Sequence, residues 1–214
     1  SLLPLKSHMD AGWARASGAG KCWRLACPCD TKGAACTPQR GISGDGMSGF
    51  EIIDAKEAHL PGVVAIFNHA VRETFSIWSE TETTLEQRKA WLAARTGAGF
   101  PVIVAVDAAR PSDVLGYGSF GVFRDFPGYV KTVEHSVYIA PSAQRRGIGR
   151  AVLAELIKRA KASGMAAMVG GIDSTNAGSI SLHQQAGFEI QGNLKGVGRK
   201  FGKSLDLVFM VKAL

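Results

Sequence analysis

The sequence contains only four cysteines in 214 residues, and all of them (Cys22, Cys27, Cys29 and Cys36) lie before residue 47. The rest of the chain therefore has no disulfide and no thiol that could carry an acyl group. The four cysteines include a Cys-x-Cys pair, but their spacing is not that of the usual paired Cys-x-x-Cys zinc sites. A small metal-binding segment is the alternative interpretation of this region. We expect no metal requirement for the protein.

Long apolar runs are also missing. No stretch approaches the ~20 residues of a membrane span, and the first residues lack the continuous apolar core of a signal peptide. We therefore expect a cytoplasmic protein that does not bind membranes. The formal net charge is +7, and part of it lies before residue 47. This modest excess does not require nucleic-acid binding, and the clustered aromatic residues of a nucleic-acid binder are lacking.

Residues 1–46 have little periodicity and are rich in Gly, Ala and Ser, and Ser7-His8-Met9 is typical of a cloning remnant. Met47 directly precedes the first strand-like run. We interpret residues 1–46 as a disordered leader, whether a natural extension or a product of cloning. Residues 47–214 form the folded domain, which is long enough and apolar enough to bury one sizeable core.

Hydrophobic periodicity predicts the elements of this domain. Thr84 and Gln87 form a capping-box pattern, and Ser163-Gly164 ends a long amphipathic helix. The predicted helices cover residues 57–70, 84–95 and 148–162, with a fourth beginning at Asn176. The predicted strands cover residues 50–54, 100–106, 114–122, 130–140, 165–171, 188–193 and 205–211. The order βααβββ-α-β-α-ββ indicates an α+β fold, with helices on a mixed, largely antiparallel sheet.

A glycine-rich segment lies between the strand ending before Pro141 and the long helix. Its glycines permit close approach to the main chain, and the free amides of the helix start attract phosphate. Neither Gly-x-Gly-x-x-Gly nor a P-loop motif is present. From these residues alone, a diphosphate site and an ordinary helix start with solvated arginines both stay open. The segment consists of Gln144, Arg145, Arg146, Gly147, Ile148, Gly149 and Arg150.

This segment, after a Val-Tyr-Ile strand, resembles the acetyl-CoA loop of the GNAT superfamily of N-acetyltransferases. A second block, from Asn176 through Ser179 and His183 to Gly187-Phe188, resembles the family's Asn-containing helix. Further strings are similar to the phosphinothricin and methionine sulfoximine or sulfone acetyltransferases of that superfamily. Those strings are residues 67–71, 132–139, 182–183, 197–202 and 205–207. The sequence departs from this family pattern at Lys203-Ser204, where relatives usually have Arg-Trp. The difference bears on the identity of the substrate more than on the type of reaction.

The resemblance implies that Glu134 is the base that accepts the proton of the attacking amine. Its position inside an apolar strand favours this role over that of a surface glutamate. His183 stands where many relatives have a tyrosine; it could protonate the CoA sulfur or assist the base, and a packed helix histidine is the alternative. We expect His135 and His69 to be structural.

The expected acetyl-CoA contacts come from the glycine-rich segment, from main-chain groups of the preceding strand and from the Asn-containing helix. A strand amide also suits the oxyanion of the tetrahedral intermediate. Beyond the segment itself, these residues are Val137, Tyr138, Ile139, Asn176 and Ser179.

For the amino-acid substrate, Arg124 suits a carboxylate by bidentate geometry. Arg72 is a weaker candidate, for which we favour a solvated surface arginine. Trp78 and Phe126 are candidates for the pocket wall, and ordinary core packing is their alternative.

The resemblance therefore implies an N-acetyltransferase that moves acetyl from acetyl-CoA to the α-amino group of a small amino acid or analogue. Methionine sulfone, methionine sulfoximine and phosphinothricin are the implied substrates. Because the domain lacks cysteine, we expect direct attack and no acyl-enzyme. The family implies a homodimer. Alternatives are acetylation of another amine, such as a peptide N-terminus or a polyamine, and a CoA-binding module without turnover.

Overall fold

The computed structural model of the protein describes residues 49–214. The leader predicted for residues 1–46 and its four cysteines lie outside the described residues. The strands are β1 (Phe50–Asp54), β2 (Val102–Asp107), β3 (Val114–Val122), β4 (Thr132–Ile139), β5 (Ala167–Asp173), β6 (Glu189–Lys200) and β7 (Lys203–Ala213). The α-helices are α1 (Leu60–Glu73), α2 (Leu85–Gly97), α3 (Ile148–Ala162) and α4 (Ala177–Gln185). This order is the predicted one, so the α+β prediction is confirmed.

Helix starts follow the predicted capping signals. Thr84 is the N-cap of α2: its Oγ1 accepts a hydrogen bond from Gln87 N at 3.2 Å, and Gln87 Oε1 accepts one from Thr84 N at 2.8 Å. Asn176 is the N-cap of α4, where its Oδ1 accepts from Ser179 N at 3.0 Å. Each cap satisfies an amide that the first helical turn leaves free.

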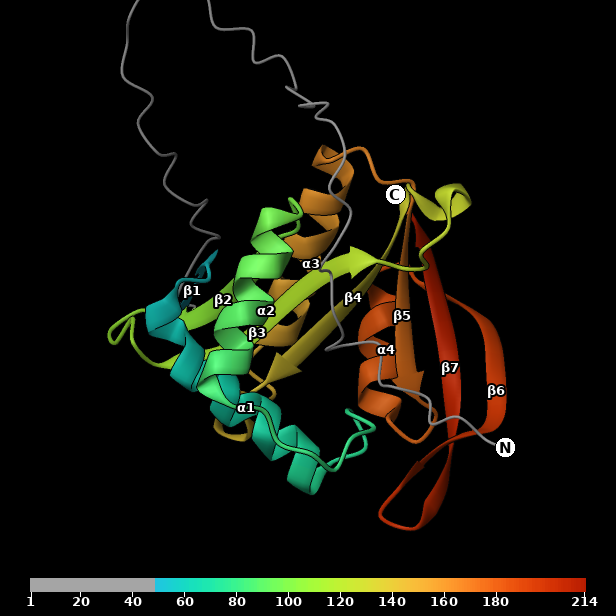
Figure 1. Ribbon diagram of the computed structural model, residues 1–214, viewed down its shortest axis with the longest axis horizontal. Helices are drawn as coiled ribbons and strands as arrows, with labels where there is room; N and C mark the ends of the chain where they lie inside the picture. Colours follow the sequence, from blue (N-terminus) through green and yellow to red (C-terminus); the bar gives the residue numbers. More distant parts are fainter. Residues whose placement is uncertain (1–48) are drawn as a thin grey trace, which may run out of the picture. The chain divides into compact units, whose positions relative to one another are not determined.

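The seven strands form one sheet in the order β1-β2-β3-β4-β5-β7-β6. All neighbours are antiparallel except β4 and β5, which run parallel and pair only from Thr132–Glu134 to Ala167–Val169. Beyond these three pairs the two strands diverge toward their carboxyl ends (Figure 1). The sheet is therefore open along the second half of β4, and we call this opening the β4–β5 wedge.

Helices cover both faces of the sheet. The largest core cluster joins α3, through Leu153 and Leu156, to Phe120 of β3 and Val133 of β4. On the opposite face α1 packs on Tyr117 of β3, through Val63 and Ile66. Because side chains alternate along a strand, His135 shares the α3 face with Val133, whereas Glu134 and Tyr138 share the α1 face.

The C-terminal hairpin is longer than the sequence pattern predicted. Strands β6 and β7 run on to a turn at Phe201 and Gly202, whose φ angles are 48° and 72°. Glycines 192, 196 and 198 interrupt the apolar pattern of β6, and the pairing shifts register between Leu194 and Gly198. The glycines therefore mark bulges in a continuing strand, and they were misread as its end.

Candidate active site

The main chain of β4 has free donors inside the wedge. Lys131 O accepts hydrogen bonds from Ala166 N and Ala167 N, so odd-numbered residues of this strand direct their main-chain groups toward β5. Pairing with β5 ends at Glu134 and Val169. The amides of Val137 and Ile139 therefore point into the opening, where no strand of residues 49–214 pairs with them.

The glycine-rich segment lies at the mouth of the wedge. Gly147 is the N-cap of α3 with a left-handed φ of 78°, and Arg145 is also left-handed at 62°. A Cβ placed on Gly149 would lie 3.5 Å from Leu182 of α4 and 3.6 Å from Ile139 of β4. The start of α3 therefore lies beside α4 and beside the carboxyl end of β4, which borders the opening.

This segment is open to solvent: Gln144 to Gly147 and Arg150 are exposed, and only Ile148 is buried. Exposed amides at a helix N-terminus, with guanidinium groups around them, are suited to a diphosphate. The arrangement fits the predicted acetyl-CoA loop.

Glu134 lies on the α1 face at the last pair before the strands separate. It pairs with Gly121 of β3 and Val169 of β5, and its side chain is 39% exposed. Its Oε1 would be 3.4 Å from a Cβ on Gly171. Partial burial raises the pKa of the Glu134 carboxyl, against the opposing charges of Arg124 and Arg95. A carboxylate with a raised pKa is a stronger base than an exposed one.

Two guanidinium groups approach this carboxylate. Arg124 Nη1 lies 4.0 Å from Glu134 Oε2 and donates to Phe123 O at 2.8 Å. Arg95, which the sequence analysis missed, lies over Gly121 of β3, so that a Cβ there would overlap its Nη1. The sequence contains only an indirect sign of this contact. Gly121, opposite Glu134, has no side chain, and this leaves room for a group from another element.

The other predicted substrate residues, Arg72, Phe126 and Trp78, lie in separate parts of the structure. Arg72 Nη1 forms an ion pair with Glu82 Oε1 at 2.8 Å, which agrees with the surface role favoured for it. Phe126 is 70% exposed, and with Arg124 it lines a cavity of about 340 Å³. Trp78 packs on β6, where a Cβ on Gly198 would overlap its ring. The structure thus brings Arg124, but not Arg72, to Glu134.

His183 is 5% exposed, and both of its ring nitrogens contact protein atoms. Its Nδ1 lies 2.6 Å from Ser179 O, and its Nε2 lies 2.9 Å from Nε2 of His135. The Nδ1 of His135 lies 2.8 Å from Val169 O. Burial lowers the pKa of both rings, that of His135 to about 3. The histidine pair links β4, β5 and α4 where the wedge begins; a role of His183 at the CoA sulfur stays a prediction.

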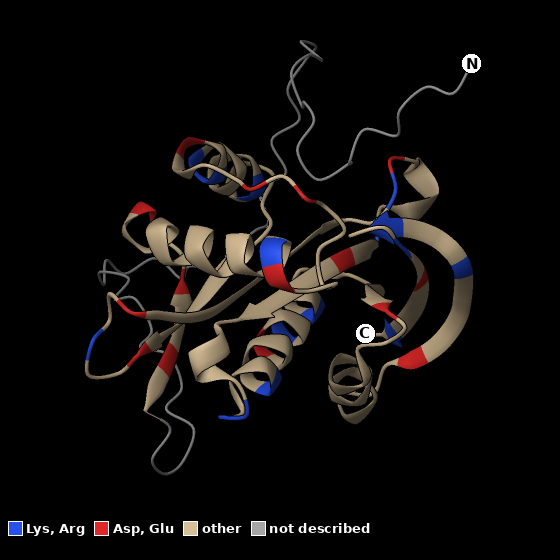
Figure 2. Cartoon of the chain, turned by 90° about the horizontal axis from the view of Figure 1, so that it is seen from below, with Lys and Arg blue, Asp and Glu red and all other residues tan. Residues whose placement is uncertain are grey.

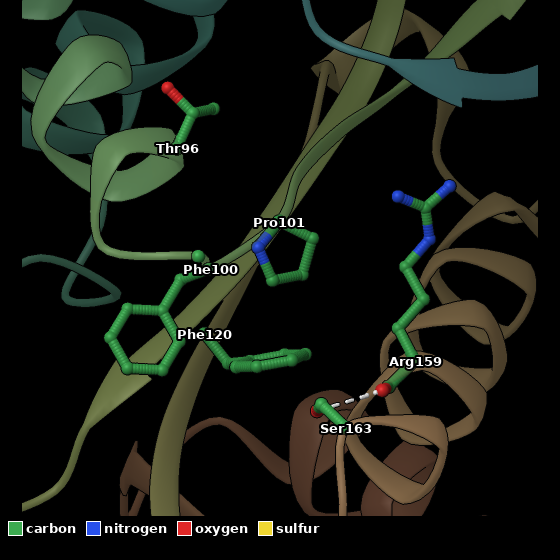
Figure 3. Close-up of a pocket in the computed structure, with 7 residues that line it drawn as sticks. Thr96, Phe100, Pro101, Phe120, Arg159 and Ser163 are labelled. Atoms are coloured by element: carbon green, nitrogen blue, oxygen red, sulfur yellow. Dashed lines mark hydrogen bonds between the residues drawn. The ribbon is translucent and has the colours of Figure 1, made fainter. Parts of the chain in front are cut away.

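A further cavity of about 340 Å³ lies away from these residues, between the carboxyl ends of α2 and α3 (Figure 3). Its lining includes Thr96, Phe120 and Arg159, and none of the predicted site residues. Within residues 49–214, no group of three His, Cys, Asp or Glu side chains could hold a metal ion. None of the helices in that range is long and apolar enough to cross a membrane.

Comparisons with known proteins agree with this geometry. Residues 63–188 match the acetyltransferase (GNAT) family. The L-methionine sulfoximine/L-methionine sulfone acetyltransferase of Pseudomonas aeruginosa is 50% identical over 159 residues, covering 74% of this chain and 91% of the relative. The phosphinothricin N-acetyltransferase of Streptomyces coelicolor is 33% identical over 170 residues, covering 79% of this chain and 99% of the relative.

Two solved structures are similar over nearly their whole length. A putative acetyltransferase from Salmonella typhimurium, with its cofactor acetyl-CoA, has a TM-score of 0.75 and 42% identity, covering 78% of this chain and 95% of its own. A ribosomal-protein-alanine N-acetyltransferase from Brucella melitensis has a TM-score of 0.74 and 49% identity, covering 77% of this chain and 99% of its own. The chain therefore belongs to the GNAT family of acetyltransferases and is an acetyl-CoA-dependent N-acetyltransferase.

Proposed function

We propose that the protein transfers acetyl from acetyl-CoA to the α-amino group of a small amino acid, with methionine sulfone, methionine sulfoximine and phosphinothricin as its substrates. One observation carries the proposal: the wedge begins at Glu134 and opens toward the exposed start of α3, with free amides of Val137 and Ile139 between them. The names of the relatives supply the substrate class.

In this reaction the neutral amine attacks the carbonyl carbon of the thioester. The C–N bond forms, the C–S bond breaks, the CoA thiolate leaves, and the amine proton passes to Glu134 directly or through water. An amide of Val137 or Ile139 donates a hydrogen bond to the acetyl oxygen as negative charge develops on it. The thiolate of an ordinary thiol, with a pKa near ~8.5, departs without an obligatory acid.

Acetyl-CoA binds along the mouth of the wedge in this proposal. The amides that begin α3 hold its diphosphate, and Arg145, Arg146 and Arg150 supply charge. Gln144, Ile148 and Gly149 complete the loop, while Tyr138 contributes main chain only, because its ring packs on Phe67 of α1. Asn176 and Ser179 border the cosubstrate from α4.

The amino acid binds on the α1 face of the sheet. Its ammonium group meets Glu134, and its carboxylate meets the guanidinium of Arg124, whose Nη1 lies 4.0 Å from Oε2 of Glu134. Trp78 closes the pocket over β6, and Phe126 borders it from the β3–β4 loop. We assign Arg72 no contact, since Glu82 already pairs with it.

We also propose that the enzyme is a cytoplasmic homodimer that needs no metal and binds neither nucleic acid nor membranes. Figure 2 supports the exclusion of nucleic acid, because Lys and Arg residues are interspersed with Asp and Glu over the elements that it draws. A basic face of the kind that tracks phosphates would require clustering of one sign.

The test is a thiol-release assay with acetyl-CoA and a panel of amines. The panel holds the standard amino acids, methionine sulfone, methionine sulfoximine, phosphinothricin, an alanine-initiated peptide and spermidine. Release of thiol with the sulfone, sulfoximine or phosphinate at the highest kcat/KM is expected. Silence across the panel, with acetyl-CoA binding intact, would indicate a CoA-binding module.

Acetylation of a peptide N-terminus is the second candidate, because the Brucella melitensis structure at 49% identity bears the name of a ribosomal-protein-alanine N-acetyltransferase. Arg124 discriminates between the two. A free carboxylate pairs with its guanidinium, whereas the peptide carbonyl of a substrate N-terminus carries no charge. A higher kcat/KM for the peptide than for every free amino acid would favour this second function.

A further inference from the structure

Lys200, the last residue of β6, has an unusual environment. Its side chain is 1% exposed, and its Nζ donates to Thr74 O and Ile77 O, both at 2.6 Å, and to Ala70 O at 3.3 Å. An ammonium has three protons, so these three carbonyls use all of them. Burial lowers the pKa of Lys200, against the opposing charge of Glu80.

The three carbonyls belong to one continuous piece of chain. Ala70 lies in the last turn of α1, Thr74 is its C-cap, and Ile77 lies in the loop that leads to α2. Ala70 O also accepts hydrogen bonds from the amide and the hydroxyl of Thr74, at 3.3 and 2.9 Å, and a cation beside the carbonyls of a helix C-terminus is favourable. Lys200 therefore fixes both the end of α1 and the path of the following loop.

Contacts next to Lys200 hold the same loop. Phe201 N donates to Glu80 Oε1 at 2.7 Å, and the rings of Phe75 and Phe201 meet edge to face with centroids 5.8 Å apart. The loop is thus attached to the β6–β7 turn by main-chain, charged and aromatic contacts. Lys200 is the only one of these groups that binds both α1 and the loop.

Trp78 directly follows Ile77, which is anchored by Lys200. Its ring occupies the place of a side chain on Gly198, and Gly198 pairs with Leu205 of β7. Leu207, two residues further on the same face of β7, lies with Glu134 against Gly171, where each would be 3.4 Å from an added Cβ. Trp78 therefore covers the face of the sheet on which Glu134 lies, with β7 and β5 between its strand and that of Glu134.

We propose that Lys200 is a positioning residue that sets acceptor specificity by holding Trp78 over Gly198. The inference rests on the proposed function, because Trp78 is assigned there to the acceptor pocket. An apolar residue would fill the same buried space without the desolvation that an ammonium suffers. What an apolar residue could not do is hold three carbonyls that come from both a helix end and a loop.

The experiment compares Lys200→Met with the unmodified protein, using the best amino acid of the panel and alanine as acceptors. We expect the KM of the best acceptor to rise about tenfold and its preference over alanine to fall by a similar factor. The KM of acetyl-CoA should change less than twofold, because the cosubstrate loop lies on other elements. Lys195→Met is the matched control: this lysine is on the same strand, is 76% exposed and pairs with Asp206.

Gly198→Ala provides a second variant that leaves Lys200 in place. The added Cβ displaces the Trp78 ring, so the same loss of preference for the best acceptor over alanine is expected. This variant tests the proposal even if Lys200→Met does not fold. The fluorine NMR resonance of 5-fluorotryptophan at residue 78, assigned with Trp78→Phe, gives a readout independent of turnover. It should shift in both variants and stay in place in Lys195→Met.

An unchanged resonance and an unchanged acceptor preference in folded Lys200→Met would overturn the proposal. A loss of thermal stability with unchanged preference would do the same, because it would reduce Lys200 to a structural role. If the unmodified protein acetylated no amino acid, the proposed function would fail. The resonance would then still decide whether Lys200 positions Trp78.

Discussion

The two sides of the β4–β5 wedge are built in different ways. The cosubstrate side is a single exposed segment, Gln144 to Arg150, whose shape depends on local conformation at Gly147 and on the free amides of α3. The acceptor side is assembled from four elements that supply Arg95, Arg124, Trp78 and Lys200, held by contacts between residues far apart in sequence. In the proposed mode of binding, recognition of CoA is therefore local and largely main-chain, whereas recognition of the amine is non-local and largely side-chain. Changes on the cosubstrate side should therefore alter only the KM of acetyl-CoA, and changes on the acceptor side only the KM of the amino acid.

Removing the charge of the cosubstrate loop should produce the largest difference between the two sides, as a rise in the KM of acetyl-CoA. Replacing Arg145, Arg146 and Arg150 together by Gln should raise the KM of acetyl-CoA roughly 10²-fold, since three exposed charge contacts contribute about 1 kcal/mol each. Steady-state kinetics at low and high salt measure this, and the unmodified enzyme should lose affinity for acetyl-CoA with salt while the variant does not. An equal rise in the KM of the amino acid would refute the separation of the two sides.

On the acceptor side, Arg124→Gln should raise the KM of the amino acid about tenfold and leave the KM of acetyl-CoA unchanged. The variant loses a charged partner for the substrate carboxylate, a contact of about 1.5 kcal/mol. Arg72→Gln is the control. Because Arg72 forms an ion pair with Glu82, this variant should keep the kcat and both KM values of the unmodified enzyme. Equal effects of the two variants would mean that neither arginine holds the carboxylate.

A smaller change separates binding from folding within the loop itself. Gly149→Ala has room for its Cβ, so the melting temperature should stay within about 1 °C, while the methyl group near the amides raises the KM of acetyl-CoA roughly fivefold. Gly147→Ala should lower the melting temperature by about 2–4 °C, because a φ of 78° costs an L-residue about 1 kcal/mol. Thermal scans combined with kinetics check both. A large loss of stability in Gly149→Ala would indicate that the loop is packed and not open.

The smallest expected effect concerns the histidine pair where the wedge begins. The folded state lowers the pKa of His135 and His183, so below about pH 6.5 the unfolded chain binds protons that the folded chain does not. Stability should therefore fall as the pH drops from 7 to 5.5 and fall less in His135→Gln. Urea unfolding at the two pH values measures this. Equal pH dependence in the two proteins would exclude the pair as its source.

The sequence predicted the fold well because its signals are local, and the prediction of the cosubstrate loop rests on signals of the same local kind. The order of elements follows from periodicity, and the capping pattern at Thr84 and Gln87 has the expected hydrogen bonds. The loop is recognisable because one continuous motif supplies its glycines, its arginines and its place before a helix.

The acceptor side was only partly predictable, because its signals are non-local. Arg95 approaches Glu134 only because α2 crosses β3 at a glycine, and Lys200 is buried only because a helix end and a loop surround it. Nothing in the sequence near either residue shows this. His135 was correctly expected to be structural, but its partner His183 lies 48 positions away and could not be assigned to it.

The most direct test of the account is the pH dependence of kcat/KM in Glu134→Gln, with acetyl-CoA affinity measured in parallel by calorimetry. Because burial raises the pKa of Glu134, the unmodified enzyme should lose kcat/KM on the acid side with an apparent pKa above 4.5. The variant should keep its affinity for acetyl-CoA, lose roughly 10²-fold in kcat/KM at neutral pH and lack that acid limb. Unchanged turnover at neutral pH, with acetyl-CoA still bound, would contradict the assignment of the wedge carboxylate as the base.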